Sequence, residues 1–364
     1  MKPSCRKPVI GSLVLLLAGC TTAGSLPEPA ATETVSPVPQ ARAPAATPVD
    51  DSERVVVEVV ARLPADMLPD EPGAPDKQTD LVRRLAAGFQ LQAEDRAEIA
   101  RQRDWFVRHP DYLARVIRRS SRYLYHIADE LERRGMPSDL ALLPIVESAY
   151  DPFAYSHGRA AGLWQMIPGT AKRFGVRQNW WYDGRRDVLD STRAALDYLE
   201  FLHEKFDGEW ELAVAAYNSG EGNVARAIRR NVKVGKPIDF WHLRLPRETT
   251  AYVPKLLALV DIVADPAAYG LELPEVDNRP YFDVVPLEGQ MDLGLLAELT
   301  GIDMDELYAL NPGFNRWATD PDGPHRAVVP AIHGRQLRLA VADLPFDSRM
   351  RWVRYRIRPG DSLI

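Results

Sequence analysis

Cysteine is nearly absent from this chain, which contains only Cys5 and Cys20 among its 364 residues. Cys5 falls in a segment with the pattern of a cleaved signal, so the mature chain would contain no pair of thiols. A fold held together by disulfide bonds is therefore excluded. The remaining length is sufficient for a large hydrophobic core and one smaller module, and the stability of the fold has to come from their packing.

Further absences narrow the class of protein. The seven histidines form no HExxH or other metal-ligand spacing, so we expect neither a metal nor another cofactor. After the N-terminal segment, no second apolar run approaches the length that crosses a bilayer. Positive charge is not in excess, because the formal net charge is −6, and this argues against nucleic acid as a partner.

The N-terminus has the three parts of a secretory signal peptide. Basic side chains come first, residues 9–18 are apolar, and small residues precede Cys20. The apolar segment is too short to span a bilayer as a helix, so residues 1–20 are predicted to be a signal peptide.

A signal that ends on cysteine resembles the signal of bacterial lipoproteins, in which that cysteine becomes the lipidated first residue of the mature chain. The resemblance implies lipidation of Cys20, and several acyl chains would anchor the protein stably. In Gram-negative lipoproteins, an aspartate directly after the lipidated cysteine favours retention in the inner membrane. Thr21 occupies that position here, so the resemblance favours the periplasmic face of the outer membrane. The alternative is an ordinary secretory peptide with an incidental cysteine.

Residues 21–75 are rich in proline, alanine, threonine and acidic side chains. A segment of this composition buries too little apolar surface to order itself, and it is predicted to form an extended tether. From Leu81 onward, apolar residues recur at three- and four-residue steps and no alternating strand pattern intervenes. The domain that follows the tether is therefore expected to be mainly α.

Glu147 is the only carboxylate in the apolar run at 141–150. Burial among Leu, Ile and Val disfavours the charged form, so the pKa of Glu147 should be raised and the side chain should stay protonated near neutrality. A carboxyl that is protonated at neutral pH is what a general acid requires. The alternative interpretation places Glu147 at a solvated helix edge, because glutamate is rarely buried.

The segment before Glu147 is predicted to be a helix. It should begin near Ser138 or Asp139, which are good helix caps, and end where Asp151 and Pro152 break it. Glu147 would then lie close to the C-terminal end of the helix and face open space.

Several short motifs follow Glu147 in a defined order. They are Glu147-Ser148, Ser156, Gly162-Leu163-Trp164-Gln165, Ala216-Tyr217-Asn218-Ser219-Gly220 and Tyr252. Together they resemble the lytic transglycosylases with a goose-lysozyme-like fold, and the match covers roughly residues 80–270. The stretches 185–187, 191–196 and 252–259 narrow the resemblance to a membrane-bound subgroup of that family.

The resemblance implies a role for each motif residue. Glu147 is the catalytic acid and Tyr252 bonds it, while substrate binding or support of the site falls to Ser148, Ser156, Gly162, Trp164, Gln165, Tyr217 and Asn218. We expect Trp164 to form part of the cleft wall, because aromatic faces cover the C–H surfaces of sugars. Amides such as that of Gln165 bond hydroxyl and N-acetyl groups.

Five of these residues also have a structural interpretation. Gln165 could cap a turn, Ser156 could be an ordinary loop residue, and Tyr252 could belong to the core. Tyr217 could end a helix, with Asn218 as its left-handed cap.

Glycosidases ordinarily need two carboxylates, whereas the motifs here offer only Glu147. Asp187 and Glu221 are better suited to a salt bridge and to the first turn of a helix. The resemblance implies a single-acid mechanism that cleaves the β-1,4 bond between N-acetylmuramic acid and N-acetylglucosamine without water and leaves 1,6-anhydro-muramoyl ends. The alternatives are a muramidase that hydrolyses the same bond and a peptidoglycan-binding protein in which Glu147 is not catalytic.

The composition changes beyond residue 274. The expected elements are a strand over 281–285, helices over 293–299 and 303–310, and a strand over 326–330. This βααβ order resembles a LysM-like module, a fold that binds N-acetylglucosamine polymers, and the alternative is a structural appendage that binds nothing. Residues 351–364 resemble the opening of another LysM repeat, and since the chain stops inside it we expect a fragment or a truncated gene product.

The predicted organisation has five parts. They are a lipoprotein signal peptide (1–20), a tether (21–75), a mainly α lysozyme-like catalytic domain (76–272), a small α+β LysM-like module (275–335) and the start of a truncated LysM repeat (351–364). The expected partners are peptidoglycan glycan strands and, through lipidated Cys20, the outer membrane. We expect a monomer.

Overall fold

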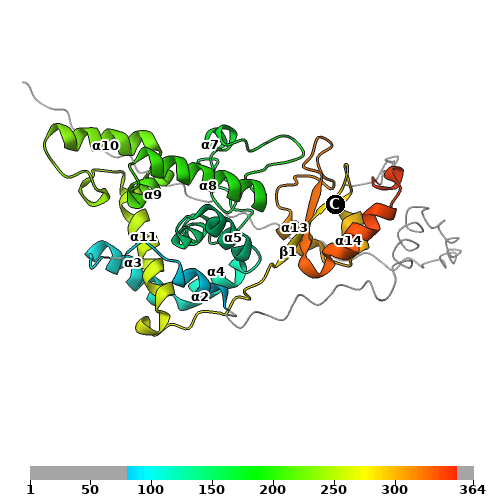
Figure 1. Cartoon of the computed structure of the whole chain (residues 1–364), viewed down its shortest axis with the longest axis horizontal. Helices are drawn as coiled ribbons and strands as arrows, with labels where there is room; N and C mark the ends of the chain where they lie inside the picture. The colour runs from blue at the N-terminus through cyan, green and yellow to red at the C-terminus, as the bar shows by residue number, and fades with distance from the viewer. Residues whose placement is uncertain (1–79, 93, 351–364) are drawn as a thin grey trace, which may run out of the picture. The chain divides into compact units, whose positions relative to one another are not determined.

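The computed structural model of the chain describes residues 80–92 and 94–350 (Figure 1). All of these residues belong to one structural unit. The predicted signal peptide with Cys20, the tether and the LysM start over 351–364 lie outside the described residues. No helix in the described ranges is long and apolar enough to cross a membrane.

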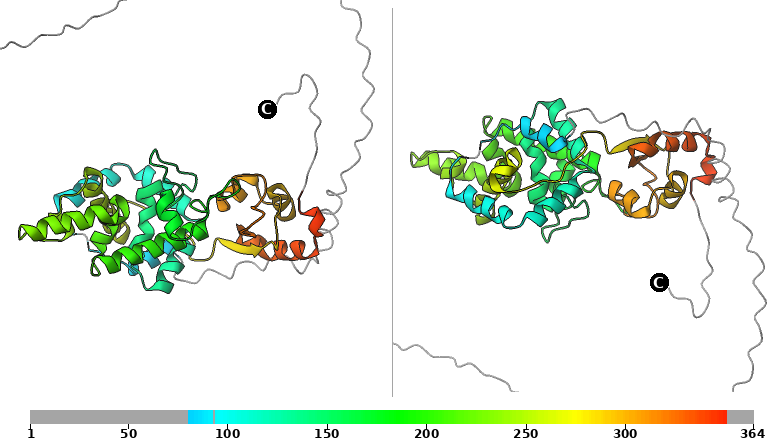
Figure 2. Two further views of the ribbon diagram at one scale, coloured as in Figure 1. Left: turned by 90° about the horizontal axis from the view of Figure 1, so that it is seen from above. Right: turned by 90° about the horizontal axis from the view of Figure 1, so that it is seen from below.

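Residues 81–269, here called the helical part, contain helices of very different length and a few short 3₁₀ helices (Figure 1). The elements are α2 (Leu81–Ala87), α3 (Ala97–Val107), α4 (Pro110–Ser120), α5 (Leu124–Arg134), η2 (Ser138–Leu142), α6 (Leu143–Ser148), α7 (Pro168–Arg173), α8 (Val188–Lys205), α9 (Trp210–Ser219), α10 (Glu221–Lys233), η3 (Phe240–His242), α11 (Arg247–Ala264) and η4 (Pro266–Tyr269). In this part of the chain, both views in Figure 2 show crossing helices without a sheet. The prediction of a mainly α domain is confirmed.

The helix α11 is the central element of the helical part. It packs against α2, α3, α6 and α9, and its side chains Leu256, Leu257 and Leu259 are fully buried. Each fully buried leucine contributes roughly 1.5–3 kcal/mol of transfer free energy, so this helix is firmly fixed. Tyr252, one turn before these leucines, is therefore held in a defined position.

The helices α8 and α9 pack side by side and lead to a sharp turn. Asp187 caps α8, because its side chain accepts hydrogen bonds from two backbone N–H groups of the first turn. At the end of α9, Gly220 has a φ of 86°, in the left-handed region that favours glycine, and α10 starts directly after it. Asn218 lies inside α9, so its interpretation as a left-handed cap is wrong.

The C-terminal module has the predicted βααβ order and one additional helix. Its elements are β1 (Phe282–Pro286), α12 (Leu293–Thr300), α13 (Met304–Leu310), β2 (Arg326–Pro330), α14 (Ala331–Asp343) and η5 (Phe346–Ser348). The strands pair antiparallel, with Val284 opposite Val328. The helix α14 packs on both strands and on α12. It was not predicted because it buries few side chains, which gives a weak periodic pattern.

Charged contacts join the module to the helical part. Arg326, at the start of β2, forms ion pairs with Asp187 at 2.8 Å and with Asp190 at 3.1 Å, both at the start of α8. Arg122 bonds Glu306 of α13 at 2.7 Å. Asp187 is buried, so loss of its partner would leave a poorly solvated charge. These pairs fix the module against the helical part.

Asn311 ends α13 and connects it to β2 through a buried amide. Its Nδ2 donates to the carbonyl oxygens of Leu307 at 2.8 Å and Val328 at 2.7 Å, and its Oδ1 accepts from the N–H of Val328 at 2.8 Å. Asn311→Ala would leave buried backbone groups of Val328 without these partners. We expect the free energy of unfolding to fall by about 2–4 kcal/mol, as measured by urea unfolding followed by far-UV circular dichroism.

Gln102→Ala is the matched control, because it removes a half-buried amide from α3. It should change the free energy of unfolding by less than about 0.5 kcal/mol. Equally small losses in both variants would show that the Asn311 amide does not stabilise the module.

Candidate active site

Glu147 lies at the end of a short helix, next to a strained turn. The helix α6 ends at Ser148, because Ala149 and Tyr150 have positive φ values of 51° and 57°. The predicted stop at Pro152 is therefore wrong by a few residues. The early stop places Glu147 on the last turn of α6.

Ser138 and Asp139 do not cap this helix as predicted. The hydroxyl of Ser138 donates to the carbonyl oxygen of Leu85 at 2.7 Å. The buried carboxylate of Asp139 accepts from the backbone N–H groups of Gln90 at 2.8 Å and Leu91 at 3.1 Å. Ser138 therefore binds the last turn of α2, and Asp139 binds the segment after it, instead of capping the helix that carries Glu147.

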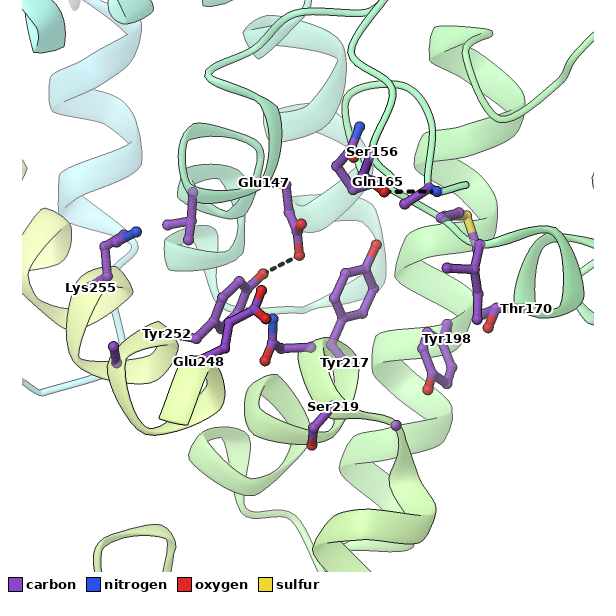
Figure 3. Close-up of a pocket in the computed structure, with 17 residues that line it drawn as sticks. Glu147, Ser156, Gln165, Thr170, Tyr198, Tyr217, Ser219, Glu248, Tyr252 and Lys255 are labelled. Carbon is purple, nitrogen blue, oxygen red and sulfur yellow. Dashed lines mark hydrogen bonds between the residues drawn. The ribbon is translucent and has the colours of Figure 1, made fainter. Parts of the chain in front are cut away.

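A cavity of about 530 Å³ opens beside Glu147 (Figure 3). Its wall is formed by α6, α7, α8, α9, α11 and the loop between α6 and α7. The predicted site residues that line it are Glu147, Ser156, Gln165, Tyr217, Asn218 and Tyr252. Segments that are far apart in the sequence thus meet at one concave site, which has the size of a small-molecule pocket.

Glu147 has the raised pKa that the sequence predicted. Burial is the main reason that the pKa of its carboxyl is raised from 4.5 to about 7, and the negative charge of Glu248 contributes to this rise. Two groups act in the opposite direction: the Tyr252 hydroxyl, which donates to Oε1 at 2.5 Å, and the positive charge of Lys255. Near neutral pH, Glu147 is therefore balanced between its protonated and ionised forms.

Two tyrosines close the cavity wall around Glu147 (Figure 3). The hydroxyl of Tyr217 donates to the backbone carbonyl of Trp164 at 2.8 Å. Burial raises the pKa of both Tyr217 and Tyr252 well above the usual value, so both phenols remain protonated donors. Beside them, Asn218 accepts from the hydroxyl of Thr249 at 2.8 Å, which ties α9 to α11.

Ser156 and Gln165 come from the loop between α6 and α7. The Ser156 hydroxyl oxygen accepts from the N–H of Ala160 at 3.1 Å. The Gln165 Nε2 donates to the carbonyls of Ala154 at 3.2 Å and Gly162 at 2.9 Å. These bonds fix the loop, and both polar side chains still line the cavity.

Trp164 does not form part of the cleft wall, contrary to the prediction. Its side chain is fully buried, and its indole N–H donates to the hydroxyl of Thr192 on α8 at 3.0 Å. The indole faces the core because a buried hydroxyl satisfies its only polar group there. Only the backbone of Trp164 touches the site, through Tyr217.

Gly162 and Ser148 support the site from behind the cavity. A Cβ atom at Gly162 would lie 2.0 Å from the carbonyl oxygen of Arg185, and its φ is 79°, so both space and conformation require glycine. The hydroxyl of Ser148 donates to the carbonyl of Leu163 at 2.9 Å and connects α6 to this loop. Neither residue lines the cavity.

Glu248 and Lys255 also line the cavity, and the sequence analysis did not identify them. Both lie on α11 together with Tyr252, at spacings of four and then three residues. Such positions share one helix face, so this spacing was the signal that could have found them. The site therefore contains a second carboxylate, which Figure 3 shows beside Tyr252.

The other carboxylates considered in the sequence have structural contacts. Asp187 caps α8 and pairs with Arg326, and Glu221 in the first turn of α10 pairs with Arg173 at 2.9 Å. Within the ranges that the structure describes, no group of three or more His, Cys, Asp or Glu side chains could hold a metal ion.

Two family profiles match the chain. The transglycosylase SLT domain matches residues 125–239, and the LysM-like domain of the lytic transglycosylase MltD matches residues 281–345. The first range contains Glu147 and most of the cavity wall, whereas Tyr252 lies beyond it. The second range contains both strands and α14.

Related proteins extend this similarity. The chain is 40% identical over 304 residues to the membrane-bound lytic murein transglycosylase D of Escherichia coli (strain K12), covering 80% of this chain and 66% of that protein, just under two thirds of its length. It is 42% identical over 170 residues to an Alteromonas sp. (strain M-1) protein named for tributyltin chloride resistance, covering 47% of this chain and 80% of that one. Among solved structures, the 70 kDa soluble lytic transglycosylase of Escherichia coli is 20% identical, with a TM-score of 0.31 over 48% of this chain and 31% of that chain.

Two substitutions should move the pKa of Glu147 in opposite directions. Tyr252→Phe removes a hydrogen bond that favours the ionised carboxylate, so the pKa should rise above about 7. Glu248→Gln removes a negative charge that favours the protonated form, so the pKa should fall below that of the parent. An NMR titration of glutamate side chains labelled with carbon-13 measures both changes without depending on any activity.

Glu272→Gln removes an exposed carboxylate outside the cavity and is the matched control. It should leave the Glu147 titration unchanged. Shifts of the same sign in the Tyr252 and Glu248 variants would contradict the electrostatic account of the site.

Proposed function

Because the chain belongs to the lytic murein transglycosylase family, we propose that it cleaves the β-1,4 bond between N-acetylmuramic acid and N-acetylglucosamine in peptidoglycan without consuming water. The observation that supports this most directly is the carboxyl of Glu147, which lies at the wall of a cavity and whose pKa is raised to about 7, so that much of it carries its proton near neutral pH. A general acid must carry its proton at the working pH.

The proposed reaction begins when Glu147 transfers its proton to the glycosidic oxygen. The bond from that oxygen to C1 of the muramoyl residue breaks, its electron pair leaves with the oxygen, and C1 acquires oxocarbenium character. The neighbouring N-acetyl group stabilises this centre. The ionised Glu147 then takes the proton of the C6 hydroxyl, whose oxygen bonds C1 and closes the 1,6-anhydro ring. Glu147 ends protonated, as it began, so one carboxyl serves both steps.

The surrounding residues fit supporting roles in this reaction. Tyr252 donates to Glu147, and this hydrogen bond becomes stronger when the carboxyl is ionised after the first step. Ser156 and Gln165 offer a hydroxyl and an amide at the cavity wall, which suit the hydroxyl and N-acetyl groups of the sugar. Asn218 lines the same wall and holds α9 against α11.

Hydrolysis is the second candidate, and a specific observation favours it. Glu248 lines the same cavity as Glu147, so the site contains the two carboxylates that an ordinary glycosidase requires. In that case Glu248 would activate a water molecule, and the product would carry a reducing muramoyl end. The anhydro product is lighter than this one by the mass of one water molecule, so the products distinguish the two reactions.

In this proposal, the two parts of the chain have different roles. Residues 76–272 carry the chemistry, and the module over 275–335 contacts the wall. The LysM-like family profile supports contact of the module with N-acetylglucosamine polymers. The ion pairs of Arg326 and Arg122 keep this module beside the helical part, so glycan contacts on it would be fixed relative to the cavity.

Glu147→Gln should retain the fold, and its turnover should fall at least about a hundredfold below that of the parent, because the amide cannot act as the acid. The measurement is mass spectrometry of the soluble products that the full chain releases from purified peptidoglycan. Asp151→Asn is the matched control, since it changes a neighbouring carboxylate that accepts a hydrogen bond from the N–H of Phe153. It should retain the parent activity.

The products of this experiment separate the candidates. Anhydro-muropeptides from the parent and from Asp151→Asn alone are the expected result. Reducing-end products would establish a muramidase, and no products from any variant would indicate a peptidoglycan-binding protein. Appreciable turnover by Glu147→Gln would reject Glu147 as the acid.

We also propose that the protein is a lipoprotein at the periplasmic face of the outer membrane. The basis is the sequence pattern that ends at Cys20 and continues with Thr21. Cys20→Ala should move the protein from the outer-membrane fraction to the soluble periplasmic fraction, whereas Cys5→Ala should leave it in the membrane fraction. Membrane retention of both variants in fractionated Gram-negative cells would contradict lipid anchoring at Cys20.

A further inference from the structure

Three tryptophans from two distant segments of the chain form a cluster at the surface. Trp180 and Trp181 come from the turn before α8, and Trp317 comes from the loop between α13 and β2. Their ring centroids lie 4.7 Å (Trp180 to Trp181), 5.6 Å (Trp181 to Trp317) and 6.3 Å (Trp180 to Trp317) apart, all in edge-to-face arrangements. We call these three side chains the aromatic platform.

The aromatic platform leaves large apolar surfaces in contact with solvent. Trp180 is 55% exposed and Trp317 is 43% exposed. Exposed indoles are unfavourable in water, and contiguous exposed aromatic side chains usually mark a binding surface. None of the three residues lines the cavity beside Glu147, so the proposed reaction does not account for them.

The backbone beneath the aromatic platform is held rigidly. Asn179 accepts hydrogen bonds from the N–H groups of Trp181 at 2.8 Å and Tyr182 at 2.7 Å, and it donates to the buried carboxylate of Asp320 at 2.6 Å. The carbonyl of Trp181 accepts from the N–H of Asn315 at 2.8 Å. A surface fixed in advance loses little conformational entropy when it binds, so this construction favours a ligand.

A positive charge completes the aromatic platform. The guanidinium carbon of Arg316 lies 3.8 Å from the centroid of the Trp180 ring, within the range of a cation–π contact. Arg316 forms no salt bridge with any residue that the structure describes, and its Nη1 donates only to the carbonyl of Asn315 at 3.3 Å. Its charge is therefore available to an anionic ligand.

We propose that the aromatic platform binds the sugar rings of a peptidoglycan glycan strand, at a site separate from the cavity. This inference rests on the proposed function for the identity of the polymer. Indole faces cover the C–H surfaces of pyranose rings, and Arg316 complements the carboxylates of the peptide stems. Within 177–183 and 313–319, the exposed large apolar side chains are the indoles of Trp180 and Trp317. These ranges contain no large exposed aliphatic side chain of the kind that a protein partner would bury.

The aromatic platform gives the module a defined role in substrate binding. Because Trp180 and Trp181 belong to the helical part and Trp317 to the module, a glycan strand bound there contacts both parts at once. A long strand would then be held at two points, the cavity and the aromatic platform, which increases its apparent affinity without a new contact in the cavity.

The test is co-sedimentation of the full chain with purified, insoluble peptidoglycan. All proteins carry Glu147→Gln, so that turnover does not remove the ligand. Combining Trp180→Ala with Trp317→Ala should weaken binding by at least about tenfold, since aromatic anchors of this kind dominate binding surfaces. Replacing both residues with Phe should restore most of the binding, because the aromatic faces remain. This second variant also separates lost stacking from lost folding.

Trp105→Ala is the matched control, because Trp105 is 41% exposed on α3 and lies outside the aromatic platform. It should bind like the Glu147→Gln parent. If the double Ala variant binds peptidoglycan as well as the Glu147→Gln parent does, the proposal is overturned. Products released by the unsubstituted chain are measured separately, so failure of the proposed reaction is distinguishable from failure of this binding site.

Discussion

The burial of one carboxyl beside one phenol is the interaction on which the rest of this structure depends. Burial raises the pKa of Glu147 to about 7, while the hydrogen bond from Tyr252 stabilises the ionised form. Because the folded-state pKa is raised above 4.5, the contribution of Glu147 to stability is fully present below pH 4.5 and is lost as the pH rises through about 7. The large core of the helical part has to compensate for that loss.

The fold holds this carboxyl in place by joining segments that are distant in the sequence. The early end of α6 presents Glu147, and the buried leucine face of α11 fixes Tyr252 opposite it. The loop that carries Ser156 and Gln165 packs against the backbone of Arg185, and only glycine fits at Gly162 where the two meet. The same helix α8 that supports this loop also binds the module through its first turn.

A comparison of the predicted and observed positions of the site residues shows how much of the site the sequence could predict. Glu147 was identified because an acid in an apolar run is a local property of a sequence, and Tyr252 was identified because the order of the motifs resembles that of a known family. Trp164 was misassigned, because the loop that carries it has one side toward the cavity and one toward Thr192, and the residue type suits either. Glu248 was overlooked, because an acidic residue in the first turn of a helix is ordinary and needs no further reason.

The sequence by itself determined the helical class of the large part, the βααβ order of the module and the identity of the proposed acid. Periodicity and local composition encode these features, since each depends on residues within a few turns of one another. Only the tertiary structure decided which side chains share the cavity, that Trp164 is buried, and that the tryptophans at 180, 181 and 317 meet. The hydrogen bond from Tyr252 to Glu147 spans 105 residues and was expected only because of the family resemblance. Local periodicity contains no information about such an approach, because the packing of whole helices determines it.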